Sequence, residues 1–257
     1  MAELNGEPVG VDQLKTLALT GYGHFTSMRV EDGRVRGLSL HLDRLVRDCQ
    51  ALFDAELDPE RVRDLARRVA LAEGACVVRV TVFDPNFDMG HPAAKADPHV
   101  LVTTRPAANL PLAPMRVQSR KYVRDLPKVK SVGLFGQLLH RRAAQLEGFD
   151  DALFVDERSL VSEGGTWNIG FFDGERVIWP EAGILGGVTM QLLKDAHAHE
   201  EMPVRLADIA GMQAVFATNA AIGVRAVSGV DDIALTDDHP IIDTLRKAYM
   251  EVPADPL

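Results

Sequence analysis

The chain has 257 residues, of which 46% are hydrophobic and 25% charged, a balance typical of a globular protein with enough apolar residues for one large core or two modest ones. Its formal charge of −9 argues against a nucleic-acid partner, because an acidic chain gains no counterion-release energy on a phosphate backbone. The sequence has no run of eighteen apolar residues and no basic-then-apolar leader, so we expect a cytoplasmic protein with no membrane partner.

The first part of the chain alternates predicted strands and helices. Turn signals such as Asp32-Gly33 bound the strand-like runs, and apolar residues recur at helical spacing elsewhere. Ser39 is a candidate cap for one helix, and Asp58-Pro59 begins a second helix that is predicted to reach about Glu73. The predicted strands are 24–30, 75–83 and 99–104.

A proline-rich stretch marks a candidate domain boundary. Residues 105–114 contain three prolines, each of which removes a backbone donor and favours extended conformation in the preceding residue. We therefore predict a small domain over 1–105, a connector over 106–114 and a larger domain over 115–257.

The second part of the chain is richer in predicted strands. Strands are predicted over 116–123, 152–156, 160–163, 169–172, 176–179 and 213–218, with helices after Lys130, after Gly186-Gly187 and over 240–249. Many strands with interspersed helices predict an α+β protein built from two units.

Three short segments could carry chemistry. Lys130 lies in an apolar segment before a helix; such lysines are usually solvated, but burial or a neighbouring cation can make the amine a nucleophile. Glu163 precedes two glycines, which is typical of a loop or of close backbone approach, and its carboxylate could pair with a cofactor ring nitrogen. Gly186-Gly187-Val188-Thr189 is either a plain turn or an anion site at a helix N-terminus.

Other polar residues give weaker indications. Arg44 lies on the polar side of a predicted helix, where an arginine is normally a surface charge. His197 and His199 are two positions apart, so a helix would point them to different faces, and we predict no metal site.

A series of strings nevertheless occurs in one order along the chain: Phe25-Thr26-Ser27-Met28-Arg29-Val30, His41-Leu42-Asp43-Arg44-Leu45, Lys130, Asp150 to Asp156 with Ser162-Glu163-Gly164 and Asn168, and Gly187-Val188-Thr189. From about Gly21 to Asp231 this series resembles the class IV (fold type IV) pyridoxal-phosphate enzymes. That group includes branched-chain, D-amino-acid and (R)-amine transaminases and 4-amino-4-deoxychorismate lyase.

The resemblance implies a role for each matching residue. Lys130 would hold pyridoxal 5'-phosphate as a Schiff base and shuttle protons, and Glu163 would pair with the pyridinium nitrogen. The implied phosphate ligands are Arg44, Gly187, Val188 and Thr189, with Thr218 and Asn219 beside phosphate or substrate, and the implied substrate residues are Phe25, Ser27, His91 and Asn219.

The resemblance also implies an architecture and partners. The fold would combine a small N-terminal α/β domain with a larger strand-rich domain containing a pseudo-barrel. The enzyme would be a homodimer acting on small molecules, namely an amino acid or amine and a keto acid.

Several positions depart from the best-known members. Gly133 stands where an asparagine is common, and Phe135 where branched-chain transaminases have a tyrosine near the cofactor ring oxygen. The segment 84–98 has no arginine, whereas D-amino-acid transaminases and the lyases often bind a carboxylate there; His91 and Lys95 are its basic residues. Residues 130–136 look closer to D-amino-acid transaminases.

Other strings point toward the lyase, among them Phe25-Thr26-Ser27 and the helix sequence from Arg44 to Gln50. We therefore expect a class IV aminotransferase, with aminodeoxychorismate lyase, which releases pyruvate, as the alternative. Two further hypotheses come from different classes of protein: a non-catalytic relative that binds a metabolite, and a metal hydrolase.

Overall fold

The computed structural model describes residues 2–257, which form two compact units. Unit 1 runs to Ala107 and also includes Val129–Gly133 and Ala254–Leu257, whereas unit 2 consists of Ala108–Lys128 and Leu134–Pro253. Both units are therefore discontinuous in sequence. The predicted linear division near 105–114 did not anticipate that five residues around Lys130 fold with unit 1.

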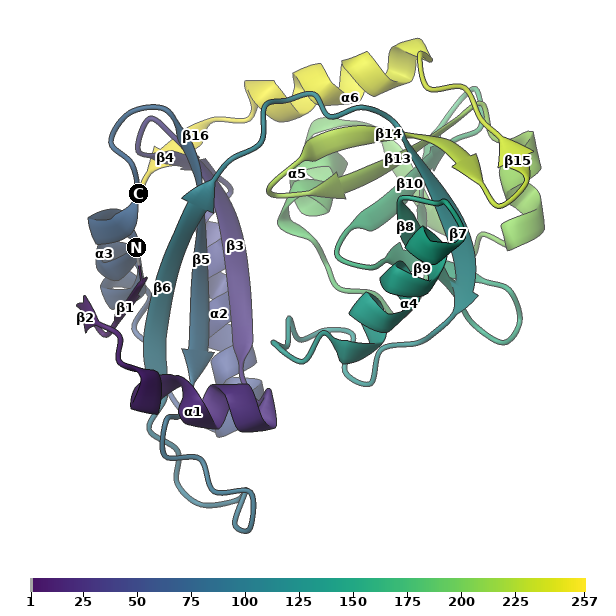
Figure 1. Ribbon diagram of the computed structural model, residues 1–257. Coiled ribbons are helices and arrows are strands. Elements are labelled where there is room, and N and C mark those ends of the chain that lie inside the picture. Colours follow the sequence, from purple (N-terminus) through teal and green to yellow (C-terminus); the bar gives the residue numbers. More distant parts are fainter. Residues whose placement is uncertain (1) are drawn as a thin grey trace. The chain divides into compact units, whose positions relative to one another are not determined.

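Unit 1 is an antiparallel sheet with helices. Its strand order is β16-β4-β3-β5-β6-β1-β2 (Figure 1). The strands are β1 (Ala2–Leu4), β2 (Glu7–Pro8), β3 (His24–Glu31), β4 (Arg34–Arg36), β5 (Ala75–Phe83), β6 (His99–Pro106) and β16 (Ala254–Pro256), and the helices are α1 (Val11–Thr20), α2 (Leu38–Phe53) and α3 (Pro59–Val69).

Alternation along β5 assigns its side chains to two faces. Val78, Val80 and Val82 pack into the main core with apolar residues of α2 and α3. Because successive strand residues point to opposite faces, Arg79 and Thr81 lie on the other face of the sheet. That second face also carries Leu101, which packs with residues of α1.

Two helix ends differ from the sequence prediction. Helix α2 begins at Leu38 after Gly37, whose φ of 68° is left-handed, so Ser39 lies inside the helix and does not cap it. Helix α3 is capped by the Asp58 carboxylate as predicted, but it ends at Val69 and not near Glu73. Helix α1 and the short strands β1, β2 and β16 were not predicted.

Unit 2 is built on a nine-stranded sheet. Its path is β12-β11-β10-β13-β14-β7-β8-β9, with β15 paired to β14. The strands are β7 (Met115–Lys121), β8 (Asp151–Val155), β9 (Val161–Gly164), β10 (Asn168–Phe172), β11 (Val177–Pro180), β12 (His199–Met202), β13 (Ala214–Asn219), β14 (Gly223–Val230) and β15 (Ile233–Ala234), and the helices are α4 (Phe135–Leu146), α5 (Val188–Ala196), the 3-10 helix η1 (Leu206–Gly211) and α6 (Pro240–Glu251).

A pairing between Glu163 and Asn168 joins β9 to β10 and closes the strands from β10 to β9 into a barrel. Apolar side chains such as Leu153, Ile169 and Val227 fill its core. The expected α+β fold with a strand-rich pseudo-barrel is therefore confirmed. No helix within residues 2–257 is long and apolar enough to cross a membrane.

Candidate active site

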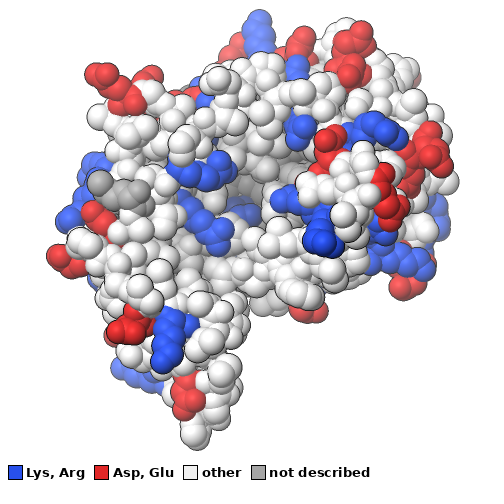
Figure 2. Space-filling model, in the orientation of Figure 1, with Lys and Arg blue, Asp and Glu red and all other residues white. Residues whose placement is uncertain are grey.

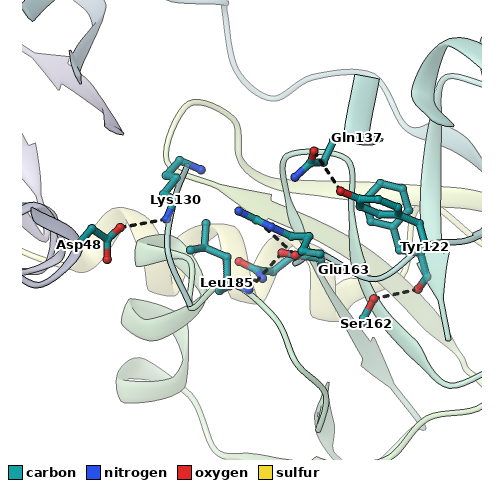
Figure 3. Close-up of polar contacts among 10 residues, drawn as sticks. Asp48, Tyr122, Lys130, Gln137, Ser162, Glu163 and Leu185 are labelled. Atoms are coloured by element: carbon teal, nitrogen blue, oxygen red, sulfur yellow. Dashed lines mark hydrogen bonds and ion pairs between the residues drawn. The ribbon is translucent and has the colours of Figure 1, made fainter. Parts of the chain in front are cut away.

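In unit 1, Lys130 lies in a segment that pairs with the beginning of β3. Its carbonyl accepts a 2.9 Å bond from the amide of Phe25, and the Val132 amide donates a 2.9 Å bond to the Gly23 carbonyl. The Lys130 amide donates to the Asp48 carboxylate at 2.9 Å, as Figure 3 shows. The lysine backbone is thus held by both β3 and α2.

The Phe25 ring brings two cations together. The Lys130 Nζ lies 4.8 Å from the centre of this ring, and the Arg79 Cζ lies 3.6 Å from it. Both distances are within the range of cation–π attraction. Arg79 also donates from Nε to the Thr81 hydroxyl at 3.2 Å.

Arg79 lines a pocket of about 310 Å³ on the second face of the sheet. The lining residues are Leu17, Gly21, Arg79, Thr81, Leu101, Thr103 and Val132. Burial lowers the pKa of Arg79 from its usual value, but an arginine remains cationic at neutral pH. The pocket therefore combines apolar walls with one cation and two hydroxyl groups. The sequence prediction missed Arg79, although register places it opposite the predicted substrate residue Ser27.

Behind Lys130, α2 contributes a buried polar group of residues. Arg44 is only 4% exposed, so it is not the surface charge that its place in the helix favours. His41 bonds the Thr26 hydroxyl at 2.7 Å through Nδ1. Burial, then the charges of Arg44 and Lys130, hold the pKa of His41 well below its usual range, so this ring is neutral.

In unit 2, the Glu163 carboxylate is buried at the end of β9 and held on both oxygens. The Arg124 Nη1 lies 3.3 Å from Oε1. The Leu185 amide donates to Oε2 at 3.3 Å, as Figure 3 shows. The Arg124 side chain is 10% exposed, so this ion pair is largely shielded from water. Arg124 is a second residue that the sequence prediction missed.

The segment before α5 is fixed near Glu163 through Leu185. The Asn168 side chain donates to the Leu185 carbonyl at 2.8 Å. A Cβ at Gly187 would lie 2.0 Å from the Asn168 Oδ1, so only glycine fits there. Gly187 caps α5 without a side-chain hydrogen bond, which leaves the first amide groups of the helix available to an anion.

Two buried hydroxyl groups accompany this helix end. Thr189 in the first turn of α5 and Thr218 in β13 are both fully buried, and their Oγ1 atoms have no hydrogen-bond partner among the described residues. A buried hydroxyl without a hydrogen-bond partner lowers the stability of the fold. Two such hydroxyls close to one helix end are therefore typical of a site that binds a polar ligand. Donor hydroxyls beside a helix N-terminus fit a phosphate group.

The remaining predicted residues have different surroundings. The Asn219 Oδ1 accepts bonds from the amides of Ala221 and Ile222, so it holds the turn after β13. His91 is 82% exposed and contacts Asp88 at 2.8 Å. It lies on the segment that projects from one end of unit 1 (Figure 1), on which Figure 2 shows both acidic and basic side chains. Within residues 2–257, no cluster of three or more His, Cys, Asp or Glu could hold a metal ion.

Tyr122, at the end of β7, is a further polar residue of unit 2. Its hydroxyl donates to the Gln137 side chain at 3.4 Å, and burial raises its pKa above the usual value. A Cβ at Gly136 would lie 2.5 Å from this ring, so the tyrosine requires a glycine in α4.

Two named aminotransferases are similar to this chain over most of its length. The probable branched-chain-amino-acid aminotransferase of Rickettsia felis is 25% identical over 272 residues, which cover 96% of this chain and 93% of that protein. A putative enzyme of the same name from Methanocaldococcus jannaschii is 26% identical over 230 residues, covering 83% of this chain and 80% of that protein.

Solved structures share the fold. The branched-chain aminotransferase of Thermoproteus uzoniensis with norvaline has a TM-score of 0.84 at 18% identity, over 97% of this chain and 93% of that one. A putative 4-amino-4-deoxychorismate lyase from Legionella pneumophila has a TM-score of 0.81 at 24% identity, over 96% of each chain. A further branched-chain aminotransferase, solved with pyridoxamine 5'-phosphate, has a TM-score of 0.83 at 22% identity, over 97% of this chain and 92% of that one.

The family model for amino-transferase class IV matches residues 23–230, which include the candidate residues of both units. This match spans most of the chain, from the start of β3 to the end of β14. The chain therefore belongs to the class IV aminotransferases.

Proposed function

We propose that the protein is a pyridoxal-phosphate-dependent aminotransferase acting on an amino acid, with Lys130 as the lysine that binds the cofactor covalently. Lys130 carries the proposal, because its backbone is bonded on both sides while its amine lies against Phe25, beside the Arg79 pocket. A lysine held in this way is suited to act repeatedly on one reacting atom.

The residues of unit 2 fit the cofactor. Thr189, Thr218 and the first amides of α5 would hold the phosphate, because the two hydroxyls are buried without partners among the described residues. Glu163 would pair with the pyridine nitrogen, and Arg44 of unit 1 remains a proposed phosphate ligand. When bound, pyridoxal phosphate supplies an electron-withdrawing ring that stabilises negative charge at the substrate α-carbon.

The chain's own groups would then move the protons. The Lys130 Nζ would take the proton from the substrate α-carbon as a general base and would later deliver it to the cofactor carbon that keeps the amino group. Phe25 restricts where that amine can lie, and the neutral ring of His41 adds no further positive charge behind it. Arg124 and the Leu185 amide hold Glu163 in one orientation.

The pocket of unit 1 supports a carboxylate-bearing substrate. Arg79 presents a guanidinium that is matched in geometry to a carboxylate, and Thr81 and Thr103 add hydroxyls. The segment 84–98 contains no arginine, so Arg79 is our candidate for the role that this segment has in related enzymes. His91 and Ser27 remain proposed substrate residues.

Aminodeoxychorismate lyase activity is the second candidate. The string Phe25-Thr26-Ser27, the pair Asn219-Ala220 and the helix sequence from Arg44 to Gln50 favour it. Both activities begin with removal of the substrate α-proton by Lys130. In a transaminase the amino group then stays with the cofactor, whereas in the lyase pyruvate leaves the substrate. Pyruvate release from aminodeoxychorismate, without net transfer of the amino group, would identify the lyase.

We also propose a cytoplasmic homodimer. Helix α4 exposes Phe135, Leu138, Leu139 and Leu146, whose side chains are 49% to 80% exposed. An apolar stripe of this kind on one helix supports association with a second copy. Sedimentation of the purified protein over a range of concentrations tests this assembly.

The proposed function is tested by cofactor uptake. Purified protein is mixed with pyridoxal phosphate, reduced with borohydride and digested, and the labelled peptide is identified. We expect the label on Lys130 and its loss in Lys130→Ala, with turnover reduced by at least about 10³-fold. Protein that takes up no cofactor would overturn the proposal, and labelled protein that turns over neither an amino acid nor aminodeoxychorismate would support the non-catalytic alternative.

A further inference from the structure

Asp48 is a carboxylate in an unusual place. It lies on α2 with its side chain 0% exposed, although aspartate is rarely buried without a partner. Arg47 donates to Oδ1 from Nε at 3.2 Å and from Nη2 at 2.8 Å. The other oxygen, Oδ2, accepts the amide of Lys130 at 2.9 Å.

The contact is specific to the backbone of the proposed nucleophile. Lys130 is 82 residues away from Asp48 in sequence, so this bond fixes a tertiary position. The flanking bonds of the segment, from Phe25 to Lys130 and from Val132 to Gly23, join backbone to backbone. Asp48 adds a charged side chain to this pattern at the residue that carries the amine.

We propose that Asp48 is a positioning residue for Lys130, an inference that rests on the proposed function of this lysine. Asp48 accepts three hydrogen bonds, and two of them come from Arg47. Arg47 neutralises the charge on Oδ1, so the carboxylate does not draw the Lys130 side-chain amine into an ion pair. Oδ2 fixes the Lys130 amide, and with it the starting point of the flexible side chain. Small displacements of a reacting atom can reduce a rate about 100-fold, so a fixed starting point matters for the transfer.

Hydrogen exchange of single amides in the cofactor-free protein tests the contact directly. Asp48→Leu removes both acceptors, and Asp48→Asn keeps the size and one oxygen. Asp43→Asn changes an exposed residue of the same helix and is the matched control. A bond from an amide to a carboxylate contributes enough free energy to slow exchange by about 10- to 100-fold.

We expect exchange at Lys130 to accelerate by that factor in Asp48→Leu and by less in Asp48→Asn. The amides of Phe25 and Val132 should exchange as in the wild type, and Asp43→Asn should change none of the three. Equal acceleration at all three amides would mean that Asp48 only stabilises unit 1, and no change at Lys130 would mean that the bond is absent; either result overturns the inference. If Asp48→Leu does not fold, Asp48→Asn decides the question alone.

The effect of Asp48 on the proposed reaction of Lys130 is measured with pyridoxal phosphate present. We expect borohydride-trappable attachment to Lys130 to slow by at least about 10-fold in Asp48→Leu, with unchanged affinity for inorganic phosphate as the probe of cofactor binding. An unchanged attachment rate would overturn the positioning role. Wild-type protein that attaches no cofactor at Lys130 would overturn the proposed function instead, and the exchange pattern would still report on the Asp48 contact by itself.

Discussion

Two groups of buried polar residues, one in each unit, differ in their hydrogen bonding. In unit 1, Asp48, the Lys130 amide, His41 and Thr26 are bonded to partners within the unit. In unit 2, Thr189 and Thr218 are buried without partners among the described residues, beside an open helix end. With the proposed roles, the bonded group of unit 1 would hold a reactive side chain in place, and the two hydroxyls of unit 2 would remain available to bind an anion.

Glu163→Gln tests the largest effect expected in unit 2. The amide has the shape of the carboxylate but no charge, so cofactor uptake should remain while turnover falls by about 100-fold or more. Turnover with an amino acid and a keto acid measures this, and Glu157→Gln, at an exposed site, is the control. Near-normal turnover would show that Glu163 does not have its proposed role in the reaction.

Arg79→Met tests whether unit 1 also recognises substrate. Loss of a guanidinium–carboxylate pair should raise KM for an amino acid by about 10- to 100-fold, while an amine that lacks a carboxylate should be unaffected. Arg61→Met, at an exposed position of α3, should change neither value. If both substrates suffer equally, Arg79 supports the fold and does not select the substrate.

Thr189→Val and Thr218→Val test whether the two buried hydroxyls of unit 2 bind the cofactor. Each replaces an unpartnered hydroxyl by a methyl group of similar shape, so the free energy of unfolding of the cofactor-free protein should rise by about 1 kcal/mol. Affinity for pyridoxal phosphate should fall by about 10-fold. Thr166→Val, which removes a hydroxyl that accepts a bond from Arg141, should lower stability. If all three variants lost stability, the Thr189 and Thr218 hydroxyls would have hydrogen-bond partners in the cofactor-free protein, and the proposed difference between the two units would be wrong.

His24 is a buried side chain of unit 1 that departs from this pattern, because neither of its ring nitrogens has a hydrogen-bond partner among the described residues. Burial, and then the charge of Arg47, lowers the pKa of His24 to about 3. The unfolded chain therefore binds a proton below pH 6.5 that the folded chain does not, and stability falls as the pH drops from 6.5 toward 3.

This histidine should cost about 1.4 kcal/mol of stability for each pH unit in that range. Urea unfolding at pH 7 and at about pH 4.5 measures the slope, and His24→Leu should flatten it. An unchanged slope in the variant would show that other groups cause the acid sensitivity.

Local signals predicted part of the fold, but no strand was predicted at β12 or at β14, which lies between β13 and β7 in the barrel. Alternation and turn residues indicated β3, β5 and the β10–β11 hairpin, and the Asp58-Pro59 pair indicated the start of α3. Pairing over long distances carries no such local signal. Nothing near residue 130 indicates that its segment bonds to Gly23 and Phe25, and nothing near residue 254 indicates a strand beside β4.

The same limit applies to the candidate site. Lys130, Glu163 and Thr189 could be proposed from their order along the chain, because a resemblance to a family follows order. Arg79, Arg124 and Asp48 could not, since each matters only through a contact made in the folded structure. For example, the sequence around Arg79 does not indicate that its guanidinium will lie over the Phe25 ring.

The discontinuous course of the chain has a consequence for biosynthesis. A growing chain that has emerged only as far as Ala107 lacks both the Lys130 segment and β16, which complete unit 1. Leu257 is itself part of the core of that unit. The complete sheet and core of unit 1 therefore form only after residues 254–257 have been synthesised, and neither unit corresponds to one uninterrupted stretch of the coding sequence.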